Sequence, residues 1–169
     1  MRGKYATKTG VSIYQTETDI KRVLLKYGAN EVMTLSSKKG AGFAFSFENR
    51  QIRIMLSLPD CKDDEFKFTP TGREKGENAQ MIAWEQACRS RYRALYMNIK
   101  MKLEAVETGI KTLEQEFYAD LVLPNGQTVA EHTMEQIIQA IDTKKMPPLA
   151  LGFDGLEDME NNIKEGKRK

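Results

Sequence analysis

The sequence predicts an α+β fold, in which an antiparallel β-meander packs on one short helix and is followed by a long amphipathic helix and a C-terminal helix. Two observations carry this prediction. Three neighbouring segments between residues 31 and 58 alternate apolar and polar or small side chains, which is typical of β-strands. Between residues 84 and 117, apolar residues recur at steps of three or four, which is typical of a helix.

The N-terminal segment is expected to form a strand and then the short helix. Residues 5–13 alternate loosely and are interpreted as the strand. Thr16 or Thr18 is the expected helix cap, because a hydroxyl accepts a hydrogen bond from the free N–H groups of a first turn. The helix is expected to end at Gly28, since glycine is favoured just after a helix.

The meander is predicted as three short strands. They cover residues 31–36, 43–47 and 52–58, and Pro59 ends the last one. On the first strand, Val32 and either Leu35 or Met33 are expected to face inward. The outward face of the sheet is expected to carry small residues, Arg53 and Met55. The phenylalanines of the second strand share the inward face, which is expected to pack on the helix at residues 18–27. These rings are therefore interpreted as core rather than as platforms for bases.

The long helix is predicted to run from residue 78 to residue 117. Gly109 lies inside this range and is expected to bend the helix. Trp84, Cys88 and Tyr92 belong to the apolar stripe and are interpreted as buried. A stripe of this length is typical of a helix that packs along another helix or a second copy of the chain.

The remaining segments are shorter. Residues 60–77 are interpreted as a polar loop that contains an edge strand at Phe66 and Phe68. After a turn at Pro124, residues 130–141 are expected to form a helix. The two consecutive prolines that begin at Pro147 are expected to end it.

One domain is expected over residues 1–153, with a helix-plus-meander part (5–58) and a helical part (78–153). The charged tail at 154–169 is expected to be poorly ordered. No apolar run approaches 18 residues and no secretory signal is recognised, so a soluble, cytoplasmic protein without a membrane partner is expected. Two cysteines are too few for a disulfide framework.

The net charge of +2 conceals a division of the chain. Residues 1–102 hold 19 Lys and Arg against 11 Asp and Glu, a net charge of +8, whereas residues 103–169 hold 7 against 13, a net charge of −6. Such asymmetry indicates a basic binding surface with an acidic segment elsewhere. The alternative is that surface charges cluster by chance.

No motif predicts a reaction, a metal site or a cofactor, so a non-enzymatic protein is expected. His132 is the only histidine and is interpreted as a surface or capping residue. The acidic segment at residues 60–65 is interpreted as a solvated loop, with a divalent-cation site as the alternative. Residues 40–42 are interpreted as part of a hairpin rather than a phosphate loop.

A nucleic-acid site is the leading functional hypothesis. Basic side chains neutralise phosphates and aromatic rings stack on unpaired bases. The candidate residues are Lys38, Lys39, Arg50, Arg53, Phe68, Arg73, Arg89, Arg91, Arg93 and Tyr96. The run from Arg89 to Arg93 is the strongest candidate for phosphate contact. The alternative interpretation is that these residues only form a solvent-exposed face of the helix.

Several segments together resemble a family of small proteins encoded by bacteriophages and prophages. The resemblance covers about residues 5–150 and rests on residues 5–9, 26–29, 45–54, 58–59, 100–107, 114–117, 123–126 and 146–148. It implies a bacterial host cell and contributes no catalytic residues.

Two functions therefore stand as hypotheses. The first is a phage-type protein that binds single-stranded nucleic acid, most simply DNA, in replication or recombination. The alternative is a protein-interaction module, such as an inhibitor of a host defence system or an assembly partner. Its basis is the apolar stripe from Trp84 to Phe117, which also predicts a homo-oligomer. A metal-dependent enzyme using residues 60–65 comes third.

Overall fold

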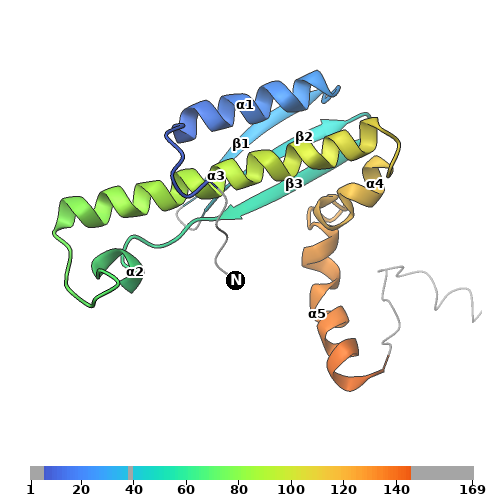
Figure 1. Cartoon of the computed structure of the whole chain (residues 1–169). Coiled ribbons are helices and arrows are strands. Elements are labelled where there is room, and N and C mark those ends of the chain that lie inside the picture. The colour runs from blue at the N-terminus through green and yellow to red at the C-terminus, as the bar shows by residue number, and fades with distance from the viewer. Residues whose placement is uncertain (1–5, 38–39, 146–169) are drawn as a thin grey trace, which may run out of the picture. The chain divides into compact units, whose positions relative to one another are not determined.

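A computed structural model of the chain describes residues 6–37 and 40–145 (Figure 1). The chain divides into two compact units, residues 1–131 and residues 132–169. The candidate residues Lys38 and Lys39, the expected stop at Pro147 and the expected tail at 154–169 lie outside the described residues.

The first unit is built on a three-stranded antiparallel sheet, which confirms the predicted α+β class. The strands are β1 (Glu31–Ser37), β2 (Gly40–Phe47) and β3 (Arg50–Ser57), in the order β1-β2-β3. Figure 1 shows α1 (Ile13–Lys26) and α3 (Glu77–Glu107) side by side over one face of this sheet. We call this the inner face and the opposite one the outer face.

The core lies between the two helices and the inner face. Phe43 and Phe45 of β2 are buried, as predicted from strand alternation, which turns both rings to the same face. Ile20 of α1, Ile52 of β3 and Ile99 of α3 have no exposed surface. Helices supply one apolar stripe each and the sheet supplies one apolar face, so two layers are enough to bury all three.

The expected strand at residues 5–13 is wrong. Residues 6–8 form a turn, and α1 begins at Ile13 because Ser12, rather than Thr16 or Thr18, caps it and accepts a hydrogen bond from the Gln15 N–H at 3.1 Å. The end of α1 agrees with prediction: Tyr27 is the cap, and Gly28 follows with φ of 92°.

The long helix is shorter than predicted, because α3 ends at Glu107. Gly109 ends the helix rather than bending it: its φ is 73°, and its N–H donates to the Val106 carbonyl at 3.0 Å. This left-handed residue just past the last turn is the usual way in which a glycine closes a helix. Thr112 then starts a separate four-residue helix, α4 (Leu113–Glu116).

The expected edge strand at Phe66 and Phe68 is also wrong. Phe66 lies in a short helix, α2 (Asp64–Lys67), and is buried against the rest of the first unit. Phe68 forms only an isolated antiparallel bridge with Glu74. Trp84 donates a hydrogen bond from Nε1 to the Pro59 carbonyl at 2.9 Å, so its indole is partly buried and its polar atom satisfied.

The predicted C-terminal helix is present as α5 (Val129–Thr143), most of which belongs to the second unit. A 3-10 helix, η1 (Tyr118–Asp120), precedes it. The apolar side chains that recur at helical spacing along α5 are exposed: Met134, Ile137, Ile138 and Ile141.

Candidate functional site

The outer face of the sheet is a candidate surface of the first unit. Across the three strands, Met33 lies opposite Ala44 and Ala44 opposite Arg53. In the next outward-facing row, Leu35 lies opposite Gly42, which lies opposite Met55. Met33 is 59% exposed and Met55 is 52% exposed, so the described residues leave both methionines accessible on this face.

The middle of the outer face is nearly free of side chains, because β2 carries glycine at positions 40 and 42. A Cβ at Gly40 would lie 2.6 Å from the Leu56 carbonyl oxygen, and one at Gly42 would meet the Ile54 carbonyl oxygen and the Met55 sulfur. The close approach of β3 therefore requires glycine at these two positions. The result is a flat strip bordered by flexible methionines.

One end of the outer face is hollowed by a shallow depression of about 160 Å³. Glu31, Met33, Arg53 and Val122 are among its lining residues. Arg53 donates a hydrogen bond to Glu131 at 2.5 Å, and hydrogen bonding from the Thr128 backbone and this guanidinium lowers the pKa of the carboxyl below its ordinary value. Arg53 therefore already has a counter-ion.

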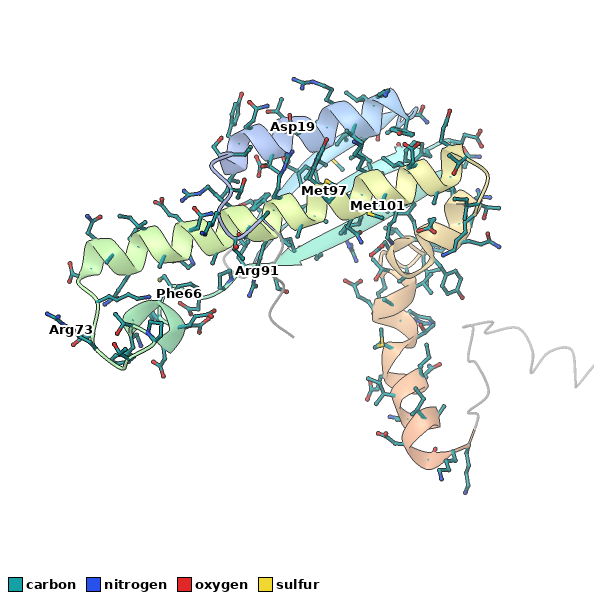
Figure 2. All side chains as sticks on the ribbon, viewed as in Figure 1. Asp19, Phe66, Arg73, Arg91, Met97 and Met101 are labelled. Atoms are coloured by element: carbon teal, nitrogen blue, oxygen red, sulfur yellow. The ribbon has the colours of Figure 1, made fainter. Side chains whose placement is uncertain are left out.

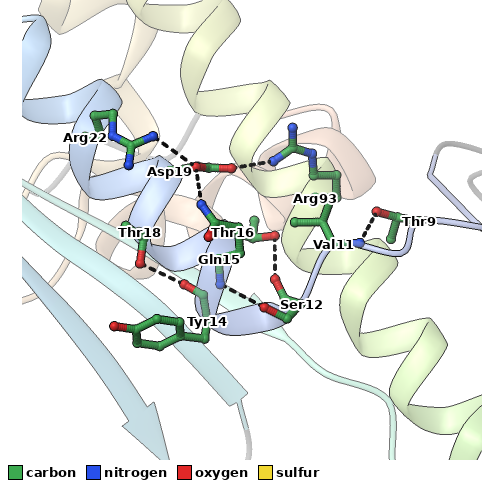
Figure 3. A network of polar contacts seen from close by, with 10 residues as sticks. All are labelled: Thr9, Val11, Ser12, Tyr14, Gln15, Thr16, Thr18, Asp19, Arg22 and Arg93. Carbon is green, nitrogen blue, oxygen red and sulfur yellow. Dashed lines mark hydrogen bonds and ion pairs between the residues drawn. The ribbon is translucent and has the colours of Figure 1, made fainter.

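The arginines of the predicted phosphate-binding run lie on different sides of α3. Arg93 donates to Asp19 of α1 at 3.1 Å (Figure 3). Its guanidinium also stacks over the Tyr96 ring at 4.2 Å. Arg89, one turn earlier, pairs with Glu85 and Gln86. At 100° per residue, a side chain two positions away from either points to nearly the opposite side of the helix.

Arg91 lies two residues from both Arg89 and Arg93, so it points to the other side of α3. Its guanidinium donates to the Ser57 carbonyl at 2.5 Å, at the end of β3. Arg50 pairs with Glu114 at 3.0 Å. Figure 2 shows Arg73 beyond α2, well away from Arg91 on α3. The structure therefore brings together Arg89, Arg93 and Tyr96, and separately Phe68 and Arg73 in one loop, but does not join Arg50, Arg53, Arg91 and Arg93 into one groove.

The two cysteines and the possible metal-binding side chains are the groups that could form a reactive or metal-binding arrangement. Cys88 is buried, as predicted, and burial raises the pKa of its thiol. Cys61 is exposed. Over residues 6–37 and 40–145, no group of three or more His, Cys, Asp or Glu side chains is placed to hold a metal ion.

Sequence reasoning placed Arg53 and Met55 on the outer face, but its expectation that Leu35 or Met33 faces inward is wrong, because both lie opposite outward-facing residues of β2. The signal was available: if Val32 faces inward, strand alternation turns Met33 outward.

Within the part of the chain that the structure describes, no helix is both long and apolar enough to cross a membrane. Comparison of the chain with protein-family models, with curated proteins and with solved structures found no match. The resemblance to phage-encoded proteins stays a prediction.

Proposed function

We propose that the chain is a non-enzymatic protein-interaction module that binds a partner protein through the outer face of its sheet. The observation that carries this proposal is the exposed pair Met33 and Met55 beside the glycine strip of β2. Exposed apolar patches with a polar rim are typical of interaction sites. Methionine is common on such surfaces because its unbranched side chain adapts to different partners.

The ion pairs of the arginines also favour a protein partner. Arg50, Arg53, Arg89 and Arg93 each have a carboxylate within 3.5 Å. A phosphate would have to displace these carboxylates, and the gain in free energy from each contact would fall accordingly.

Site-specific photo-crosslinking in cells that express the chain tests the proposal. A photoreactive amino acid at position 33 or 55 is expected to give a protein adduct of one size. The same residue at Met101, which is 68% exposed on the solvent side of α3, is the matched control. The adduct at position 33 should disappear when Met55 is changed to Glu and persist when Met101 is changed to Glu.

Equal adducts at positions 33 and 101, or an adduct that survives Met55→Glu, would contradict the proposal. Circular dichroism of each variant must match the parent, which excludes unfolding as the cause of a lost adduct.

Single-stranded nucleic acid is the second candidate ligand, favoured by the net charge of +8 over residues 1–102. Fluorescence anisotropy with a labelled oligonucleotide at two salt concentrations tests it. Phosphate contacts release counter-ions, so true binding must weaken as salt rises. Arg91→Gln and Arg73→Gln should each weaken binding if these exposed arginines contact phosphates. No binding at low salt, or binding insensitive to salt, would eliminate this candidate.

A further inference from the structure

A second cavity lies on the helix-covered side of the sheet, where four segments of the first unit meet. It has a volume of about 390 Å³, within the range of small-molecule sites. Its walls come from the end of α1, the β2–β3 turn, the end of α3, and α4. We call it the glutamate pocket, and it is lined by Tyr27, Gly28, Phe47, Glu48, Arg50, Leu103, Val106, Glu107, Leu113 and Glu114.

The floor of the glutamate pocket is apolar. Phe47, Leu103, Val106 and Leu113 contribute hydrocarbon surface, and Leu103 is 2% exposed. Leu103 belongs to the core of the first unit, and Phe47 and Leu113 pack against that core, so contacts that fold the chain also hold most of the floor. A ligand with an apolar stem would lose water-exposed surface here.

The charged groups of the pocket are mainly negative. Glu48, Glu107 and Glu114 line it, and Arg50 is the cation among its lining residues. Arg50 donates from Nε to Glu114 at 3.0 Å, which balances one carboxylate. Within the described residues, no ion pair joins Glu48 or Glu107 to a basic side chain.

Helix ends add to this negative potential. α1 ends at Lys26 and α3 ends at Glu107, and residues at or just beyond both ends line the pocket. The C-terminus of a helix carries a partial negative charge from its free carbonyl groups. The Tyr27 hydroxyl also donates to Glu104 at 2.5 Å, which places a fourth carboxylate next to the pocket wall. Lys26 lies over the Tyr27 ring at 5.7 Å but does not line the pocket.

We propose that the glutamate pocket binds a small organic cation, namely a protonated amine or a guanidinium on an apolar stem. The stem would lie on the floor and the cationic head between Glu48 and Glu107. Such a head group comes either from a free alkylamine or from a lysine or arginine side chain of a peptide. The pocket and the pair Met33 and Met55 lie on opposite faces of the sheet, so this proposal does not depend on the proposed function.

Titration of the full chain at low ionic strength, followed by NMR chemical shifts, tests the inference. The probes are n-butylguanidine, a free alkylguanidine, and a capped tripeptide with a central arginine. 1-Butanol is the neutral control and should not give saturable shifts. Saturable binding of n-butylguanidine alone identifies a small-molecule site, and binding of the tripeptide alone identifies a site for a partner's side chain.

Matched variants locate the binding. Glu48→Gln and Glu107→Gln should each weaken the bound probe about threefold to tenfold, because each removes one charge-assisted contact. Glu135→Gln, an exposed position on α5, carries the same charge change and should leave affinity unchanged. Arg50→Gln should tighten binding by releasing Glu114, whereas Arg73→Gln should not.

The proposal is overturned if neither probe gives saturable shifts. It is also overturned if Glu135→Gln weakens binding as much as Glu107→Gln, because affinity would then follow net charge rather than the pocket. Thermal melting curves of the variants, compared with the parent, show that the fold is retained.

Discussion

The ring of Phe117 packs edge-on against the ring of Phe45, with centroids 5.7 Å apart and ring planes at 83°. Phe117 has no exposed surface, although it lies beyond the end of α3. Its burial anchors the chain that returns to β3 through the bridge between Ile52 and Leu121. The return segment is therefore part of the folded core.

Replacing this ring should cost stability. Phe117→Ala is expected to lower the free energy of unfolding by about 3–5 kcal/mol, since it removes a buried ring and leaves a cavity. Urea denaturation followed by circular dichroism measures the loss. The control is Tyr118→Ala at the neighbouring residue, which is 64% exposed and should change stability by about 0.5 kcal/mol or less. Similar losses in the two variants would contradict the role of Phe117 as an anchor.

The left-handed glycine that ends α3 gives a second prediction. A Cβ at Gly109 would touch nothing within 4 Å, but its φ of 73° is unfavourable for other residues. Gly109→Ala should therefore lower stability by about 1–2 kcal/mol through backbone strain alone. Gly10→Ala also meets open space, without a left-handed φ, and should leave stability unchanged or slightly higher. A loss in both variants, measured by urea denaturation, would point to a cause other than φ.

Stability should fall at alkaline pH because of Tyr92. Burial, together with the charge of Glu17, raises the pKa of Tyr92 to about 12 from an ordinary value of about 10. Between these two pH values the unfolded chain loses the phenolic proton while the folded chain keeps it, so the folded state loses stability as pH rises. Tyr92→Phe should make this decline shallower in urea titrations between pH 10 and 12. A decline as steep as in the parent would disprove the assignment.

The two cysteines should differ in reactivity. Cys61 is exposed, whereas Cys88 is 1% exposed and burial raises the pKa of its thiol. Because the thiolate is the reactive form, Ellman's reagent should modify one thiol rapidly in the folded chain and the second only on unfolding. Cys61→Ser should abolish the rapid phase and Cys88→Ser should retain it. Two rapid thiols in the folded parent would mean that α3 is not packed as described.

The candidate surface was only partly predictable. Strand alternation places Arg53 and Met55 on the face away from the helices, and the structure agrees. The pairing of the arginines was not predictable, because their partners are distant in sequence: Arg93 and Asp19 are 74 residues apart, and Arg53 and Glu131 are 78 apart. A charge count over residues 1–102 contains no information on such pairs.

The sequence by itself determined the elements whose signals are local. The three strands, the close of α1 at Gly28 and the burial of Cys88 all follow from periodicity or from the conformation of one residue. Tertiary structure decided the rest, because it depends on contacts between distant segments. Gln86 and Ser90 of α3 donate hydrogen bonds to the carbonyl groups of residues 6, 7 and 9, which therefore do not pair with a strand. The buried stripe does not continue unbroken, because Ile110 is 74% exposed. The chain turns at Gly109 and buries Phe117 against Phe45 of β2, since one straight helix would carry this ring away from the sheet.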